Sequence, residues 1–106
     1  MTRLIAAASA LALAALAALP AAAQNLAVRF QNNSGETVYR IYSSPTTEGS
    51  WRNDLLGEDV LYPGQGLDVL FANVGNCYYD VLIEFESGRS FTDTWDVCAF
   101  SQYNIN

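Results

Sequence analysis

The sequence predicts an all-β fold: a small antiparallel β-sandwich or barrel of about six or seven short strands, held by one disulfide and preceded by a cleaved signal peptide. Apolar and polar residues alternate with a period of two in several short runs, as they do in strands with one buried face. Clusters of Gly, Pro, Asn and Ser separate these runs and favour turns. No segment combines a helical apolar stripe with capping residues.

The first 23 residues have the layout of a secretory signal peptide. Arg3 precedes an apolar run over residues 4–19, and Ala21–Ala23 offers the small residues that a signal peptidase recognises. The run is shorter than the ~18 apolar residues that a membrane-spanning helix needs. We therefore expect a signal peptide over residues 1–23 and a single β domain over residues 24–106. This domain would lie in the periplasm or outside the cell, with no membrane attachment after cleavage.

The domain left after cleavage is strongly acidic. Its 83 residues hold four arginines against eleven carboxylates, a net charge of −7, with no lysine and no histidine. This charge argues against nucleic acid and anionic membranes as partners, and it suits a basic protein or a divalent cation. Acidic charge also keeps a small exported domain soluble without any specific partner.

Cys77 and Cys98 are the only cysteines. In an exported protein two cysteines are expected to form a disulfide. A chain of this size buries a modest core, and closing a loop of about twenty residues contributes roughly 3 kcal/mol to stability.

The alternation also predicts which strands are neighbours. Tyr39 and Ile41 lie on one predicted face of the second run, opposite Arg40. Turn residues 32–35 separate this run from the first, so we expect the first two runs to form a hairpin. The predicted strands are residues 26–31, 37–43, 67–73, 77–86 and 89–98.

The turn between the last two predicted strands fixes their register. A two-residue loop at residues 87–88 pairs the two cysteines but sets apolar side chains opposite polar ones. A three-residue loop with Gly88 in the left-handed region sets Ile83 opposite Phe91, which burial favours. The cysteines then face apart unless a bulge near Asp96–Val97 shifts the strand by one residue. We predict the second register with such a bulge.

The composition excludes most catalytic machinery. Without histidine or lysine the chain cannot build a Ser-His-Asp triad, a Cys-His pair or a Schiff base, and two cysteines do not make an ordinary zinc site. Two carboxylate chemistries remain: a glycosidase acid pair and a calcium site. The candidates for both are Asp54, Glu58 and Asp59, and Asp80 could approach them in the glycosidase case. No Asp-x-Asp-x-Asp-Gly calcium loop is present.

Residues 44–66 form the longest irregular stretch and are the predicted binding loop. Residues 53–57 fit one helical or 3₁₀ turn, and Leu61–Tyr62 a brief strand. Long loops on a rigid scaffold often carry binding sites. The alternative is that Trp51 folds back with Leu55 and Leu56 to plug the core. The predicted binding residues are Trp51, Arg52, Asp54, Glu58 and Asp59.

Four short motifs follow one another: W-x2-D-x-L-G at 51–57, P-G at 63–64, C-x-Y-D at 77–80 and D-V-C at 96–98. Together they resemble a family of small exported bacterial all-β domains with no established activity. The resemblance implies a Cys77–Cys98 bridge and a structural role for Asp54, whose carboxylate would accept backbone N–H bonds. Some members carry enzyme names such as argininosuccinate lyase, an activity that needs residues this chain lacks. Arg52 departs from the family pattern.

These observations lead to one expected function and two alternatives. We expect a non-catalytic, monomeric, exported binding domain without a cofactor, and a basic protein such as a cell-wall hydrolase is the expected partner. The first alternative is a structural domain stabilised by calcium. The second is a glycosidase with paired carboxylates.

Export can be tested directly on the native protein. Mass spectrometry of the chain isolated from the producing cell should give a polypeptide that begins at or near Gln24, because cleavage is expected after Ala23. A full-length chain that still begins at Met1 would contradict the prediction.

Overall fold

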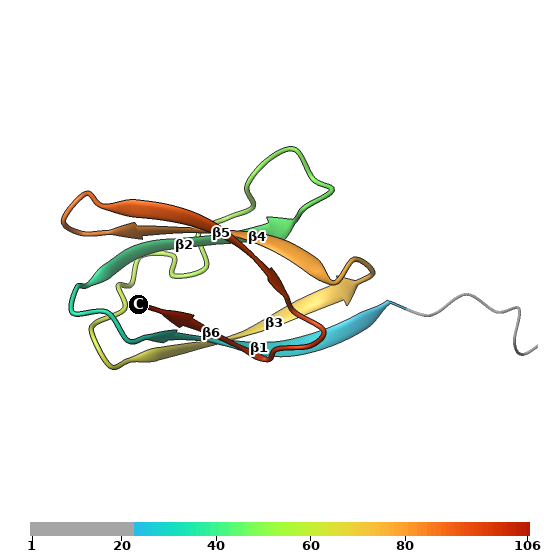
Figure 1. Ribbon diagram of the computed structural model, residues 1–106, viewed down its shortest axis with the longest axis horizontal. Helices are drawn as coiled ribbons and strands as arrows, with labels where there is room; N and C mark the ends of the chain where they lie inside the picture. Colours follow the sequence, from blue (N-terminus) through green and yellow to red (C-terminus); the bar gives the residue numbers. More distant parts are fainter. Residues whose placement is uncertain (1–22) are drawn as a thin grey trace, which may run out of the picture.

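The computed structural model describes residues 23–106, which fold into two stacked three-stranded β-sheets (Figure 1). The predicted all-β class and the Cys77–Cys98 disulfide are both confirmed. The predicted signal peptide, apart from Ala23, lies outside the described residues. Within residues 23–106 no helix has the length and apolar character needed to cross a bilayer.

Six strands follow one another along the described chain, and the chain changes sheet after every strand except β4, an order that the sequence did not predict. One sheet has the order β3-β1-β6 and the other β2-β4-β5. β6 runs parallel to β1, whereas the other neighbours are antiparallel. The strands are β1 (Gln24–Asn32), β2 (Val38–Pro45), β3 (Gly66–Val74), β4 (Tyr78–Phe85), β5 (Ser90–Asp96) and β6 (Gln102–Ile105).

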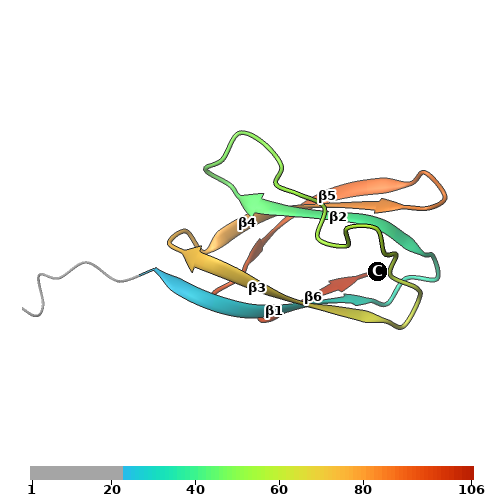
Figure 2. The same cartoon turned by 180° about the vertical axis from the view of Figure 1, so that it is seen from behind.

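The core lies between the two sheets, as both views of the ribbon show (Figures 1 and 2). Its side chains come from alternate positions of the strands, because successive residues of a strand point to opposite faces. At its centre Trp95 packs with Phe30, Phe71 and Tyr103, at ring-centroid distances of 5.6, 6.3 and 5.5 Å. The buried indole N–H of Trp95 has no hydrogen-bond partner among the described residues.

The predicted hairpin of the first two strands is wrong, because β1 and β2 lie in different sheets. β1 has a neighbour on each side, β3 and β6, so no edge remains for β2. The connection after β1 instead crosses from one layer to the other. The cause is local: the side chain of Asn32, the last residue of β1, turns inward and organises the crossing.

Asn32 is fully buried, and its side chain and backbone together bond to three separate segments. Its Nδ2 donates to the carbonyls of Glu36 and Leu61, each at 2.9 Å. Its Oδ1 accepts from the backbone N–H of Ser34 at 3.0 Å and from the Ser34 hydroxyl at 2.6 Å. The backbone of Asn32 also bonds to Gln65 and Gly64, just before β3. One residue thus joins the turn after β1, the long loop and the start of β3.

The start of β2 departs from strict alternation. Its register with β4 shifts between Val38 and Arg40, so Val38 and Ile41 are both buried while Tyr39 is 46 % exposed. The prediction that Tyr39 and Ile41 share a face is therefore wrong, because an irregularity of this kind changes which residues face inward. Val38 also forms an isolated β-bridge with Leu61. This single bridge stands where the sequence predicted a brief strand at Leu61–Tyr62.

The β4–β5 hairpin has the register that burial favoured. Ile83 pairs with Phe91 and Tyr79 with Trp95, across a three-residue turn in which Gly88 has a φ of +94°. A turn replaces the predicted bulge. β5 ends at Asp96, whose Oδ1 accepts the N–H groups of Cys98 and Ala99 at 3.0 and 3.1 Å. This turn lets Cys98 reach Cys77, with their Cα atoms 5.3 Å apart.

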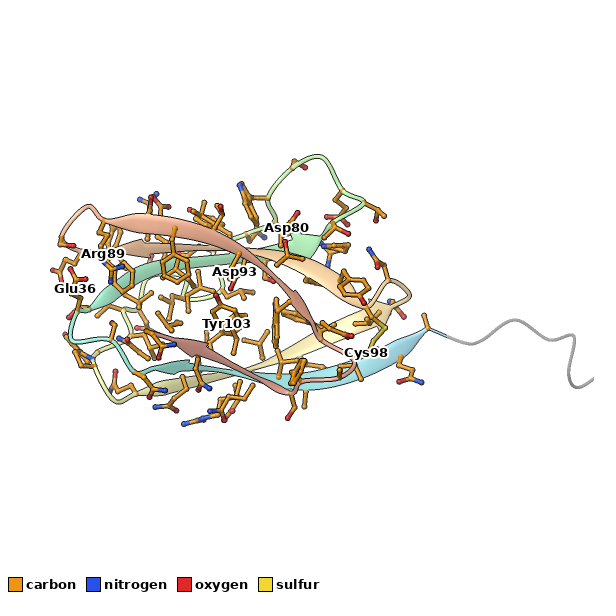
Figure 3. All side chains as sticks on the ribbon, viewed as in Figure 1. Glu36, Asp80, Arg89, Asp93, Cys98 and Tyr103 are labelled. Carbon is orange, nitrogen blue, oxygen red and sulfur yellow. A yellow bond between two sulfur atoms is a disulfide. The ribbon has the colours of Figure 1, made fainter. Side chains whose placement is uncertain are left out.

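The two open sides of the sandwich are closed in different ways. On one side the segment before β3 passes between the layers and inserts Leu56 and Leu61, which are 7 % and 4 % exposed (Figure 2). On the other side Asp93 of β5 accepts a hydrogen bond of 2.8 Å from the hydroxyl of Tyr103 on β6 (Figure 3). Burial, and then this hydrogen bond, raise the pKa of Tyr103, so its hydroxyl stays protonated as the donor. An inward-pointing carboxylate on β5 also discourages pairing with another chain.

Substitution at Asn32 tests its role in the crossing. Asn32→Ala breaks four hydrogen bonds, two that Nδ2 donates and two that Oδ1 accepts, and leaves the partner groups unsatisfied inside the protein. It should therefore lower the free energy of unfolding by roughly 2–3 kcal/mol in denaturant titration. Asn33→Ala is the matched control. The exposed Asn33 side chain bonds only to Asn104, so that change should cost less than about 0.5 kcal/mol. Equal small losses for the two variants would contradict the assignment.

Candidate binding face around Trp51

The loop after β2 projects from the outer side of the β2-β4-β5 sheet (Figures 1 and 2). Thr46 fixes its start, because its N–H donates to the Tyr78 carbonyl at 3.0 Å and its hydroxyl accepts from Asn76 at 3.1 Å. Glu48 and Arg52 then close the loop through hydrogen bonds of 3.0 and 2.5 Å. Both of these side chains are exposed, so the pair shapes the loop more than it stabilises the fold.

Trp51 lies on this loop with 40 % of its surface exposed. Its ring contacts that of Tyr42 on β2, with centroids 6.5 Å apart and planes inclined by 45°. Leu56 is buried and Leu55 packs against the core, whereas Trp51 does not join them. The plug alternative therefore holds for the two leucines and fails for Trp51.

Trp51 and Asp80 line two adjacent surface hollows. The smaller, of about 210 Å³, is lined on the loop side by Ser44, Glu48, Gly49 and Ser50. The larger, of about 450 Å³, is lined on the β5 side by Thr92, Asp93 and Thr94. Because both hollows share an exposed indole and a carboxylate, the two side chains form one aromatic and acidic surface. We call the set Tyr42, Trp51, Asp80, Thr92 and Thr94 the Trp51 face.

Strand pairing assembles the Trp51 face from three strands. Ser44 of β2 pairs with Asp80 of β4, and Asp80 pairs with Thr94 of β5. The Thr94 hydroxyl donates to Asp80 Oδ1 at 2.8 Å, which orients the carboxylate. Figure 3 shows Asp80 on the outer side of the sheet, close to the projecting loop. Its position is thus set by two rigid neighbours.

No arginine of residues 23–106 lines either hollow of the Trp51 face. Arg29 pairs with Asp68, Arg52 with Glu48 and Arg89 with Glu36, and the Arg40 guanidinium lies 4.8 Å from the Tyr39 ring centroid. Three of the eleven carboxylates are therefore paired, and the other eight, Asp80 among them, have no arginine partner among the described residues. The excess negative charge of the domain is not neutralised internally.

Hydrogen bonding shifts two of the paired carboxyl groups. The Ser87 hydroxyl, followed by Arg89, lowers the pKa of Glu36. The Arg52 guanidinium likewise lowers the pKa of Glu48. Both groups therefore stay ionised to lower pH than an isolated glutamate, which keeps the ion pairs intact at neutral pH.

The residues predicted for a single binding loop separate into three positions. Trp51 belongs to the Trp51 face, and Arg52 is held by Glu48. Asp54 has a structural role, because its Oδ1 accepts the N–H groups of Ile41 and Leu56 at 3.0 and 3.1 Å. Glu58 and Asp59 line a different hollow of about 770 Å³, next to Tyr62 and the start of β3. The structure thus brings only part of the predicted set to one place.

The carboxylates proposed for calcium do not gather into a ligand set. Among residues 23–106, Cys77, Asp96 and Cys98 are the only group of three such side chains whose ligand atoms lie close together. Their sulfurs form the disulfide, and one Asp96 oxygen accepts two backbone N–H groups. The expected approach of Asp80 to the other acids is wrong, because Asp80 lines the hollows with Trp51 while Glu58 and Asp59 share another hollow.

The sequence interpretation did not identify Tyr42, Thr92 and Thr94 as members of the candidate face. Each is an ordinary outward-facing strand residue, and no motif distinguishes it. The β4–β5 register could have identified the two threonines from the sequence. The pairing that sets Ile83 opposite Phe91 also sets Asp80 opposite Thr94 and Leu82 opposite Thr92.

Comparison with known protein families, with curated proteins and with solved structures finds no match to this chain. The resemblance to a family of small exported bacterial domains therefore stays a prediction.

Substitution distinguishes exposed from structural positions in the loop. Trp51→Ala should change the free energy of unfolding by about 1 kcal/mol or less, since Trp51 loses mainly its contact with Tyr42. Leu56→Ala should cost roughly 2–5 kcal/mol, because Leu56 is buried in the core. Thermal or denaturant unfolding of both variants is the measurement, and a loss at Trp51 as large as that at Leu56 would show that Trp51 is a core residue.

Proposed function

We propose that this chain is a non-catalytic, exported binding domain whose partner is a basic protein, and that the partner docks on the Trp51 face. The observation that carries the proposal is the exposed Trp51 beside the unpaired carboxylate of Asp80, both lining the same two hollows. Exposed Trp residues are frequent anchors of protein interfaces. Here the anchor lies on a loop that is fixed at Thr46 and by the Glu48–Arg52 pair, beside strand residues of the sheet, which keeps the cost of ordering the site low.

Charge supports a basic partner. The domain has a net charge of −7, and eight of its carboxylates have no arginine partner among the described residues. An acidic surface attracts a basic protein at long range and raises the rate of association at low salt. The partner we favour is a cell-wall hydrolase or another basic protein of the same compartment.

The residue types of the domain support a role without catalysis. It has no histidine and no lysine, and both cysteines are joined in the disulfide. Histidine and lysine as general bases, and the nucleophiles that they activate, are therefore missing. Asp54 is occupied by backbone N–H groups. The Trp51 face instead presents aromatic, carboxylate and hydroxyl groups that can bind a partner.

Two features support export. Disulfides persist in oxidising compartments such as the periplasm and the extracellular space. β1 begins at Gln24, directly after the predicted cleavage site, so removal of residues 1–23 would leave every strand of the sandwich in place.

Affinity capture tests the proposal. The native exported chain, immobilised and exposed to extract from its own compartment, should retain a basic protein that re-binds when purified. Raising the salt from about 0.05 to 0.5 M should weaken binding at least tenfold, because ionic screening shortens the reach of the attraction.

Two variants locate the contact. Trp51→Ala should weaken binding at least tenfold. Leu70→Ala should leave it unchanged, because Leu70 is an apolar residue that is even more exposed, at 63 %, but lies on β3 of the other sheet. Retention of neutral or acidic proteins alone, or binding insensitive to Trp51→Ala, would refute the proposed face.

A further inference from the structure

The larger hollow beside Trp51 is rich in hydrogen-bond acceptors. The residues that line it beside Trp51 are Asp80, Thr92, Asp93 and Thr94, and no arginine of the described chain lines it. The Thr94 hydroxyl already donates to Asp80. The remaining side-chain donors are the Thr92 hydroxyl and the Trp51 indole N–H. A ligand group that only donates hydrogen bonds is therefore the best chemical match.

Asp80 is the acceptor best placed for such a group. Its Oδ1 accepts from Thr94, and its Oδ2 receives no hydrogen bond from the described residues. Asp93 is less available, because one oxygen accepts from Tyr103 and the other from the N–H of Thr94, each at 2.8 Å. Its charge still adds to the negative potential at the rim. The incoming group would thus meet one oriented carboxylate with a second close by.

Only two protein side chains carry a permanent positive charge with donors and no acceptor: the lysine ammonium and the arginine guanidinium. The guanidinium fits this surface better for two reasons. It is planar and stacks on an aromatic face, and its parallel N–H groups match a carboxylate. A sugar would need donors for its own oxygens, and the lining offers few.

The same domain already contains this arrangement once. The Arg89 guanidinium lies 3.9 Å from the centroid of the Phe85 ring, and its Nε donates to Glu36 at 2.7 Å. An aromatic face and a carboxylate together hold an arginine there, at the far end of the sandwich (Figure 3). Trp51 and Asp80 provide the same two components on the open surface, with no arginine of the described chain between them.

We infer that the hollow between Trp51 and Asp80 is the seat for an arginine side chain of the partner protein, stacked on the indole and paired with the Asp80 carboxylate. This inference rests on the proposed function, since it names the group through which the basic partner is recognised. It also predicts that arginine is preferred to lysine.

The test is an NMR titration of the native exported chain with three probes: the blocked tripeptides acetyl-Ala-Arg-Ala-amide and acetyl-Ala-Lys-Ala-amide, and a neutral amino-sugar oligomer. The arginine peptide should shift the Trp51 indole N–H and the Thr94 amide with a saturable curve. The lysine peptide should bind at least threefold more weakly, and the oligomer should cause no shift.

Two matched carboxylate variants distinguish a specific arginine site from nonspecific electrostatic attraction to the acidic domain. Asp80→Asn should weaken the arginine peptide at least fivefold. Asp68→Asn removes the same charge from the other sheet, where Asp68 pairs with Arg29, and should leave the titration unchanged. Because both residues are on the surface, both variants should fold, which their amide spectra will verify.

Three results would overturn the arginine seat: equal binding of the two peptides, preference for the sugar oligomer, or equal effects of the two Asn variants. The proposed function is judged separately by partner capture. If a basic protein still binds in a Trp51-dependent way, the docking face stands and only the arginine assignment fails. If capture also ignores Trp51→Ala, both fail.

Discussion

The architecture depends on one buried amide. Asn32 sits where β1 ends, and its side chain bonds to the turn that follows and to the loop residue Leu61, while its backbone bonds to the residues just before β3. A polar group without water must find partners inside the protein, and this one finds four. Those partners come from the turn and the long loop, and the Asn32 backbone adds the residues before β3, so the chain leaves the first sheet at this point. The pairing of β2 with β4, and hence the second sheet, follows from that departure.

The position of Trp51 is a consequence of how the long loop is divided. Asp54 accepts the N–H of Ile41, a residue on the free edge of β2, and the N–H of Leu56. This contact fixes the middle of the loop against the sheet and directs Leu56 into the core. Residues before Asp54 are left on the outer side, where Trp51 has only Tyr42 as an aromatic neighbour. One carboxylate thus separates the structural half of the loop from the exposed half.

The alternation of apolar and polar residues predicted most of the strands, but it could not predict which strands pair with one another. The β4–β5 register follows from the sequence because burial of Ile83 against Phe91 and the left-handed Gly88 agree on one answer. The hairpin predicted for β1 and β2 is wrong because the sequence 32–35 looks like a hairpin turn, whereas the buried Asn32 makes it a crossing between the sheets. β6 was missed because four residues carry too little pattern. Trp51 was identified by type, but Asp80 and Thr94 join it only through register.

β1 occupies the middle of its sheet, between β3 and a parallel β6 that is drawn from the last residues of the sequence. The sheet therefore cannot be completed until residues 102–105 have left the ribosome. Every neighbour of β1 is distant in sequence, and domains built from such distant pairings fold slowly, on the order of milliseconds to seconds. Until residues 102–105 are available, β1 has only β3 as a neighbour and one of its edges stays unpaired. The exposed edge of a central strand is thus a feature of the incomplete sheet that the finished topology removes.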